Sequence, residues 1–283
     1  MIDKVWVIGA SSFTGQYLMP QLIQAGYQTD STSVDLTNAQ QVEQAILHIQ
    51  PDYIINLAAI SFVPDGANAE IYALNTFGAQ NILDACLKLP QAPKRIILVS
   101  SSQVYGQQNN EVLDENCIVN PINHYGCSKW AMEQIAKTYR DKLAITITRP
   151  FNYTGKEQAE KFLIPKIIQH FQQKSSTIKL GNIDIWRDFS DVRWIVQVYT
   201  ALLSDPASEL SIVNLCSGKL TSIREIIQQL QKETGHTIRI ETDQRFVRAT
   251  DIVSQRGSSQ HLMRIMPGLH PIPLSQTLTW MMS

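Results

Sequence analysis

A tyrosine and a lysine lie four residues apart in the segment Tyr125-Gly126-Cys127-Ser128-Lys129. On a helix, this spacing puts both side chains on one face, within reach of each other. A nearby ammonium group favours the phenolate and lowers the pKa of a tyrosine, so that its hydroxyl can exchange a proton near neutral pH. The pair alone is common, and a solvated helix pair is the simpler interpretation. Its meaning therefore depends on the rest of the chain.

A run of hydroxyl groups follows a short apolar stretch at residues 96–99. The stretch is typical of a buried strand, and it leads into the segment Ser100-Ser101-Ser102-Gln103-Val104-Tyr105-Gly106. In open α/β folds, ligands bind outside the carboxyl ends of the parallel strands. These hydroxyls therefore lie where an active site would form.

A glycine-containing loop follows the first apolar run, as Gly9-Ala10-Ser11-Ser12-Phe13-Thr14-Gly15. It fits a G-x-x-G-x-x-G pattern at both ends but has Ser12, with its hydroxyl donor, in place of the middle glycine. Gly9 permits a tight turn, Gly15 lets a helix pack close to a sheet, and the amides between them would face a diphosphate at the helix N-terminus. An ordinary strand-to-helix turn is the alternative interpretation.

Two aspartates follow this loop. Asp30 lies about 20 residues beyond it, where a Rossmann unit places an acid on the adenosine ribose of NAD. Residues 31–33 (Ser-Thr-Ser) could instead solvate the 2′-phosphate of NADP, although no Lys or Arg occurs between residues 16 and 36. Asp35 is the alternative acid and could contact adenine, and either aspartate could be a turn or cap residue. The sequence therefore leaves NAD(H) and NADP(H) both open.

The elements that would position these residues alternate along the first half of the chain. Short apolar runs at residues 5–8, 53–57, 95–100 and 143–148 are separated by segments with apolar residues partly at helical spacing. This alternation predicts a parallel sheet. The expected fold is α/β: a Rossmann-type doubly wound parallel sheet with a smaller mixed α/β C-terminal lobe.

Several helix boundaries are also predicted. Thr37 with Gln40, and Ser222 with Glu225, could form capping boxes, and Gly235 could end the second of these helices. Pro20 lies inside the first predicted helix, where we expect a kink.

The composition argues against several other classes of protein. The 283 residues carry 24 Lys and Arg against 25 Asp and Glu, which leaves no basic excess for binding nucleic acid. The longest mostly apolar run, residues 53–63, is too short to cross a bilayer, and the N-terminus leaves no room for a signal peptide. We therefore expect a cytoplasmic protein. Its four cysteines lack metal-binding spacing, so we expect reduced thiols and no metal site.

Taken together, these motifs resemble the extended short-chain dehydrogenase/reductase superfamily of nucleotide-sugar epimerases, dehydratases and reductases. Asn75 and Asn81 also match its pattern. The resemblance implies that Ser101 polarises a sugar carbonyl or hydroxyl, that Tyr125 exchanges its proton, and that Lys129 binds the nicotinamide ribose and tunes Tyr125. The implied cofactor-binding residues are Gly9, Ser11, Ser12, Phe13, Thr14, Gly15, Asp35, Leu36, Leu57, Ala58, Ala59, Tyr125 and Lys129.

The resemblance also implies that different parts of the chain bind the cofactor and the substrate. Residues 1–150 would form the NAD(P)-binding Rossmann domain, with residues 191–205 returning to it. Residues 151–283 would form an interlaced nucleotide-sugar-binding lobe. Members of the superfamily often dimerise through the helices that begin near Asn75 and Tyr125, so we expect a homodimer. Trp130, Met132 and Ile135 could provide its apolar contact, although burial within one subunit explains them equally well.

The second half of the chain resembles the GDP-mannose branch of the superfamily. The matching segments are Arg149-Pro150-Phe151-Asn152-Tyr153-Thr154-Gly155, Gly181-Asn182-Ile183-Asp184, Arg187-Asp188-Phe189-Ser190-Asp191-Val192-Arg193 and Asn214-Leu215-Cys216-Ser217-Gly218. An arginine suits a diphosphate because its planar fork makes bidentate contacts, although Arg187 could instead pair with Asp188 or Asp191. Arg248 lacks the proline that often follows it in the branch. The implied substrate-binding residues are Ser102, Gln103, Asn152, Arg187, Arg248 and Asp251.

Gln103 separates the possible activities. Dehydratases of this kind carry a Glu base two residues after the catalytic Ser or Thr, and an amide cannot replace that base at neutral pH. A 4-reductase needs only a hydride and one proton donor. We therefore expect a 4-reductase of a GDP-4-keto-6-deoxyhexose such as GDP-4-keto-6-deoxymannose, with a rhamnose or talose product. The alternatives are a 4-epimerase with tightly bound NAD, a catalytically silent nucleotide-binding sensor or scaffold, and a dehydratase with another base such as Asp65 or Glu70.

Overall fold

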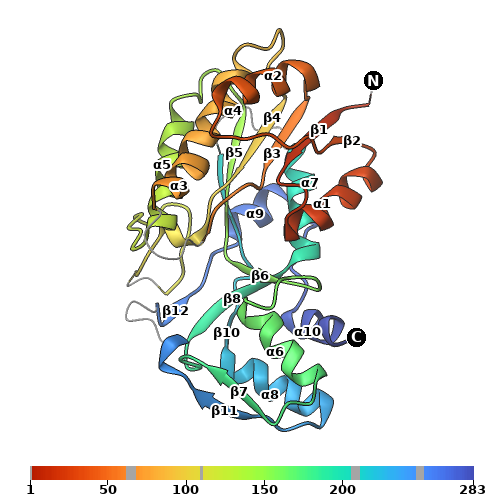
Figure 1. Cartoon of the computed structure of the whole chain (residues 1–283), viewed down its shortest axis with the longest axis vertical. Coiled ribbons are helices and arrows are strands. Elements are labelled where there is room, and N and C mark those ends of the chain that lie inside the picture. Colours follow the sequence, from red (N-terminus) through yellow and green to blue (C-terminus); the bar gives the residue numbers. More distant parts are fainter. Residues whose placement is uncertain (1, 62–67, 109–110, 205–210, 247–251) are drawn as a thin grey trace.

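A six-stranded parallel sheet forms the larger part of the molecule (Figure 1). The computed structural model describes residues 2–61, 68–108, 111–204, 211–246 and 252–283. In sheet order, the strands are β2 (Gln28–Asp30), β1 (Lys4–Ile8), β3 (Tyr53–Asn56), β4 (Arg95–Val99), β5 (Ile145–Pro150) and β9 (Ser211–Leu215). All four strands predicted from the apolar runs are present as β1, β3, β4 and β5.

Helices cover both faces of this sheet. On one face, α2 (Ala39–Ile49), α4 (Gly78–Cys86) and α5 (His124–Lys137) share a core cluster with the strands. On the other face, α1 (Phe13–Gln24), α7 (Val192–Leu203) and α9 (Gln260–Ile265) share a second cluster. The short helix α3 (Asn68–Tyr72) and a π-helical turn, η1 (Ala73–Phe77), lead into α4. This arrangement confirms the predicted Rossmann-type doubly wound fold.

The strand order places a ligand site at one point of the sheet. The chain passes from β1 outward to β2 and then returns to β3 on the other side of β1. In doubly wound sheets, such a reversal opens a crevice at the carboxyl ends of the two strands. The glycine-containing loop after β1 and residues 57–60 after β3 therefore flank the expected crevice.

A smaller lobe lies below the large sheet in Figure 1. Its central strand β8 (Trp186–Asp191) pairs with β6 (Asn152–Thr154), β10 (Leu220–Ser222) and β12 (Ser254–Gln255). Strands β7 (Thr177–Leu180) and β11 (Arg239–Thr242) form a separate parallel pair. A third core cluster packs around α6 (Leu163–Gln172), α8 (Ile223–Thr234) and α10 (Leu274–Met282). Short 3-10 turns occupy η2 (Ser102–Val104) and η3 (Gln244–Phe246).

The chain crosses between the two parts more than once. After β8, helix α7 packs against the large sheet, and β9 then pairs with β5 at the edge of that sheet. Strand β9 and helix α9 lie outside the expected return segment, so more of the second half supports the large sheet than the sequence indicated. The structure therefore connects the two parts through several strands and helices rather than one linker.

Local signals explain where helix α8 begins and ends. Ser222 and Glu225 form the predicted capping box, because the Ser222 hydroxyl accepts from the Glu225 amide and the Glu225 carboxylate accepts from the Ser222 amide. Gly235 then ends the helix with φ of +67°, a conformation that favours glycine. Helix α1 continues past Pro20 to Gln24.

The other predicted capping box, of Thr37 and Gln40, is wrong. The N-cap of α2 is Asn38, whose side chain accepts from the Gln41 amide at 3.1 Å. The Thr37 hydroxyl instead donates to the Asp35 carboxylate at 2.7 Å. Both residue types can cap a helix, but the hydrogen bond to Asp35 occupies Thr37, so Asn38 is the N-cap.

Within the described ranges, every helix is too short or too polar to cross a membrane. All four cysteines are free thiols.

Candidate active site

The three expected catalytic residues come from two neighbouring elements. Ser101 follows the end of β4 and caps the 3-10 turn η2, where its hydroxyl accepts from the Gln103 amide at 3.2 Å. Tyr125 lies in the first turn of α5, and Lys129 follows one turn later. The Lys129 Nζ is 6.0 Å from the centre of the Tyr125 ring. The structure therefore brings these two side chains together beside the carboxyl end of β4.

Burial dominates the electrostatics of this group. Loss of water raises the pKa of Tyr125 to about 12, with a further rise from Tyr153 and an opposing effect of the Ser101 hydroxyl. Burial also lowers the pKa of Lys129 to about 8, and the Glu133 carboxylate opposes this shift. The expectation that Lys129 lowers the pKa of Tyr125 is therefore wrong for this structure. Its ammonium group donates to the Val99 carbonyl at 2.7 Å, and desolvation of the phenol is the larger effect.

Asn75 connects the loop after β3 to the catalytic helix. Its amide accepts from the Ile60 N–H and donates to the Ile60 carbonyl, both at 2.9 Å. It also donates to the Ser128 hydroxyl at 3.0 Å, and that hydroxyl donates to the Tyr125 carbonyl at 2.8 Å. Asn75 lies in the π-helical turn η1, a feature that often marks functional sites. The resemblance singled out Asn75, but no local sequence pattern indicates these contacts.

The glycine-containing loop fits a dinucleotide diphosphate. Gly9 has φ of +82°, and a Cβ there would lie 3.1 Å from the Ala58 amide nitrogen. A Cβ at Gly15 would lie only 2.4 Å from the Ala10 carbonyl oxygen. The loop backbone is therefore packed too closely for side chains at these points. Ser12 is the N-cap of α1, where its hydroxyl accepts from the Gly15 amide at 3.1 Å and keeps its own proton free to donate.

The two candidate adenosine contacts lie at different places. Asp30 is the last residue of β2 and is partly buried, with its carboxylate accepting from the Thr32 amide at 2.8 Å. Asp35 is in the next turn, where two hydrogen bonds from Thr37 lower the pKa of its carboxyl. Its neighbour Leu36 is buried, and the Leu36 carbonyl accepts from the Asn81 amide at 2.8 Å.

Two residues that are expected to bind the substrate form hydrogen bonds with other side chains near η2. Ser102 is buried, and its hydroxyl and carbonyl both hydrogen-bond the side chain of Gln255 on β12, at 3.4 and 3.2 Å. Gln103 is exposed, and its side-chain oxygen accepts from the Asn123 amide at 2.7 Å. Asn123 is also the N-cap of α5 through its hydrogen bond with the Gly126 amide. Gln103 therefore touches the start of the catalytic helix.

The remaining expected substrate contacts lie on the smaller lobe. Asn152 is exposed on β6, and its amide donates to the Asp188 carbonyl at 3.4 Å. Arg187 on β8 donates to the Trp186 carbonyl at 2.9 Å. The alternative partner Asp191 pairs with Arg193 at 2.6 Å. Arg248 and Asp251 lie outside the described residues, as does Asp65.

Sequence reasoning missed a contact between the glycine-containing loop and the smaller lobe. The Tyr153 hydroxyl lies 2.8 Å from the Thr14 hydroxyl, and its ring stacks on Phe13 with centroids 6.2 Å apart and planes 13° apart. The two residues are 139 positions apart in sequence, so no local pattern could reveal the contact.

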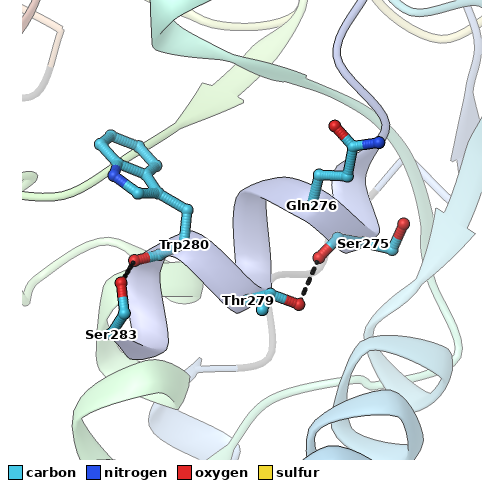
Figure 2. Close-up of a pocket in the computed structure, with 5 residues that line it drawn as sticks. All are labelled: Ser275, Gln276, Thr279, Trp280 and Ser283. Carbon is cyan, nitrogen blue, oxygen red and sulfur yellow. Dashed lines mark hydrogen bonds between the residues drawn. The ribbon is translucent and has the colours of Figure 1, made fainter.

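Two surface hollows lie elsewhere on the molecule. A shallow depression of about 410 Å³ lies on α10 and is lined by Ser275, Gln276, Thr279, Trp280 and Ser283 (Figure 2). A smaller hollow of about 160 Å³ lies beside β8 and is lined by Phe189, Ser217, Lys219, Thr221, Pro271, Ile272, Pro273 and Leu274. Neither is lined by Ser101, Tyr125 or Lys129. The candidate active site is therefore the group of residues at the carboxyl edge of the sheet, not either of these hollows.

Comparison with known proteins agrees with this geometry. A sequence model of the family described as GDP-mannose 4,6 dehydratase matches residues 28–267. The GDP-6-deoxy-D-talose 4-dehydrogenase of Aggregatibacter actinomycetemcomitans is 34% identical, over 93% of this chain and 91% of that protein. The GDP-6-deoxy-D-mannose reductase of Pseudomonas aeruginosa is 28% identical, over 93% of this chain and 90% of that protein.

Solved structures give the same answer for the fold. A candidate epimerase from Burkholderia cenocepacia J2315 superposes with a TM-score of 0.93 at 35% identity, over 99% of this chain and 97% of that one. RMD from Pseudomonas aeruginosa, solved with NADPH, superposes with a TM-score of 0.89 at 27% identity, over 100% of this chain and 97% of that one.

The fold, the Ser101, Tyr125 and Lys129 group, and these likenesses define the class of protein. It is a nucleotide-sugar enzyme of the extended short-chain dehydrogenase/reductase superfamily. Within that superfamily, the chain belongs to the GDP-mannose 4,6 dehydratase family.

Proposed function

We propose that the protein reduces the C4 ketone of a GDP-4-keto-6-deoxyhexose and so produces a GDP-6-deoxyhexose. Gln103 carries the proposal, because it occupies the place of the base that a 4,6-dehydratase requires. Its side chain is an amide held by Asn123 at 2.7 Å, and an amide is not basic enough to remove a sugar proton. The two relatives named as a 4-dehydrogenase and a reductase of GDP-6-deoxyhexoses support redox chemistry at C4.

The residues at the sheet edge suit such a reduction. The glycine-containing loop and residues 57–59 would hold a nicotinamide dinucleotide, which supplies the hydride when bound. Ser101 would orient the sugar carbonyl, and Tyr125 would protonate the oxygen. The raised pKa of Tyr125 keeps its phenol protonated at neutral pH, which is the form that a proton donor needs. Lys129 would bind the nicotinamide ribose with its ammonium group.

The smaller lobe would hold the rest of the substrate. Asn152 is exposed at the start of β6, directly after β5, which is the neighbour of β4 in the large sheet. Arg187 lies on the adjacent strand β8, two residues before Phe189, and Phe189 is the residue that pairs with Asn152. A guanidinium suits a diphosphate through charge-assisted hydrogen bonds. We therefore assign the sugar to the side of Asn152 and the diphosphate to Arg187.

The test is oxidation of NADH and NADPH, in parallel, after GDP-4-keto-6-deoxymannose is added to the purified protein. Tyr125→Phe should lose at least about 100-fold in turnover, because it removes the proton donor, while still binding reduced cofactor. The stereochemistry of the product then distinguishes a rhamnose from a talose product. Absence of turnover with both cofactors would rule out this reductase for this substrate, and full activity in Tyr125→Phe would favour a catalytically silent scaffold.

We propose that the preferred cofactor is NAD(H), on the evidence of Asp30. A carboxylate at the end of β2 accepts the ribose hydroxyls of NAD and repels the 2′-phosphate of NADP. Replacing it, in Asp30→Ser, should raise the ratio of kcat/KM for NADPH over NADH by about 10-fold or more. Asp35→Asn is the matched control and should leave that ratio largely unchanged. A wild-type enzyme that prefers NADPH would contradict this assignment.

A 4-epimerase is the second candidate, favoured by the 35% identity with the candidate epimerase of known structure. An epimerase would use the same three residues but would keep its NAD tightly bound. Release of NAD from the denatured, freshly purified protein, with interconversion of C4 epimers and no net cofactor oxidation, would identify it.

We also propose that the protein is a homodimer formed through α4 and α5. Phe77, just before α4, is 55% exposed although it is aromatic, and Leu87, just after α4, is 42% exposed. Trp130 and Ile135 on α5 are partly exposed, whereas Met132 is buried at 1% and belongs to the core of the subunit. Met132 therefore cannot be part of the expected contact.

A further inference from the structure

Glu133 is a buried carboxylate on the catalytic helix, one turn beyond Lys129. Its side chain is 0% exposed, and it accepts three hydrogen bonds. Two come from Arg149 on β5, from Nε at 2.9 Å and from Nη2 at 2.6 Å. The third comes from the Ser100 hydroxyl at 2.5 Å. This carboxylate therefore joins α5 to the ends of two strands of the large sheet.

The Ser100 contact bears directly on the candidate site. Ser100 immediately precedes Ser101, and it follows Val99, whose carbonyl accepts from Lys129 at 2.7 Å. Helix α5 is thus attached to two consecutive residues at the end of β4, through Lys129 and through Glu133. Because Ser101 is the next residue along the chain, these attachments fix its place relative to the helix.

The groups behind Glu133 form a buried hydrogen-bonded network. Arg149 is 2% exposed, and its Nη1 donates to the Tyr105 hydroxyl at 3.0 Å. That hydroxyl donates to the Asn214 side-chain oxygen on β9 at 2.7 Å. The bidentate pair offsets the loss of water from both charges, and Glu133, Arg149, Tyr105 and Asn214 all have hydrogen-bond partners. Fully partnered buried networks of this kind restrict the side chains to one arrangement.

We propose that Glu133 is a positioning residue for the reaction. Held from behind by Arg149, its carboxylate holds the Ser100 hydroxyl, and so sets the separation between Ser101 and Tyr125. This inference rests on the proposed function, because the separation matters only where both residues act on one substrate oxygen. Errors of about 1 Å in such placements can reduce rates by about 100-fold.

The test uses Ser100, because a change at Glu133 would leave the buried Arg149 charge without a partner and could prevent folding. Ser100→Ala removes the attachment and keeps the Glu133–Arg149 pair. Ser100→Cys fills the same space with a weak hydrogen-bond donor. Ser190→Ala is the matched control, since Ser190 is 1% exposed and its hydroxyl has no hydrogen-bond partner among the described residues.

We expect Ser100→Ala and Ser100→Cys to lower kcat by about 10- to 100-fold while KM for the cofactor changes by less than about 2-fold. Ser190→Ala should keep the wild-type kcat. Amide hydrogen exchange at residues 102–104 should become faster in both Ser100 variants. Wild-type kcat in Ser100→Ala would overturn the inference, as would full recovery in Ser100→Cys, because loss of packed volume would then explain the effect.

Hydrogen exchange separates this inference from the proposed function. Should the wild-type protein reduce no keto sugar, the proposed function fails, and exchange still reports on the attachment. Faster exchange in the Ser100 variants would then support the attachment of Ser100 to Glu133, and unchanged exchange would overturn it.

Discussion

Lys129 and Tyr125 are titratable groups that both lose water in the folded protein. Burial lowers the pKa of Lys129 to about 8 and raises that of Tyr125 to about 12. As pH rises through about 8, Lys129 therefore loses its proton while the phenol keeps its own. Because the ammonium group is the form that binds the ribose in the proposed mechanism, we expect kcat/KM to fall above about pH 8.

The pH dependence is measured as kcat/KM, which reports the free enzyme, from neutral to alkaline pH. Lys129→Arg supplies the control, since a guanidinium stays charged across this range. That variant should lack the alkaline decline whatever its absolute rate. A wild-type profile that stays level well above pH 8 would show that Lys129 does not control the reaction.

At the residue scale, the sequence predicts the kinds of group present but not their electrostatics. The spacing of Tyr125 and Lys129 predicts that they share a helix face, because that follows from helix geometry alone. The direction of the Tyr125 pKa depends on how much water the phenol loses, which distant residues decide. The Ser100, Glu133 and Arg149 contacts also join separate elements, so no local pattern contains them.

At the scale of elements, Asp188 holds three segments of the smaller lobe together. Its buried carboxylate accepts from the Ser217 amide and hydroxyl, at 2.8 and 2.6 Å, from the Gly218 amide at 2.9 Å and from the Gly257 amide at 3.2 Å. Asp188→Ala would leave the buried Gly257 amide and the partly buried Ser217 and Gly218 donors without this acceptor. At about 1 to 3 kcal/mol for each unsatisfied donor, we expect a loss of at least about 3 kcal/mol of unfolding free energy.

Urea unfolding measures this loss directly. Asp184→Ala is the control, because Asp184 forms an exposed ion pair with Arg224 and exposed pairs contribute little. Equal midpoints for the two variants would contradict the proposed role of Asp188 in joining the segments.

The elements themselves follow from the sequence where their signals are local. Alternating apolar runs predict β1, β3, β4 and β5, and the Ser222 box predicts the start of α8. Strand β9 was not expected in the large sheet, because its place beside β5 is decided by the return of the chain through α7. The order of strands in a parallel sheet is a property of the whole topology.

At the scale of the molecule, the two parts meet around the start of α1. Thr14 contacts Tyr153, and the Tyr17 hydroxyl donates to the Lys156 carbonyl at 2.8 Å. On α10, the centre of the Trp280 ring lies 3.8 Å from the Arg193 guanidinium carbon. The loop that would bind the cofactor is therefore packed against the lobe that would bind the sugar. Figure 1 shows α1 at the lower right of the large sheet, on the side toward the smaller lobe.

The proposed dimer contact lies on the face of the large sheet that α4 and α5 cover, opposite to the face that α1 covers. A substitution of Phe77, just before α4, tests this contact. Burying a phenylalanine side chain contributes about 2 kcal/mol, and two-fold symmetry would bury one from each subunit. A carboxylate at this position would need to lose its water at the interface without a partner. Light scattering at micromolar concentration should therefore find a dimer for the wild-type protein and a monomer for Phe77→Glu. Ile23→Glu, on the other face of the sheet and 60% exposed, should remain a dimer. A dimeric Phe77→Glu variant would place the contact elsewhere. A monomeric wild-type protein would contradict the proposed dimer.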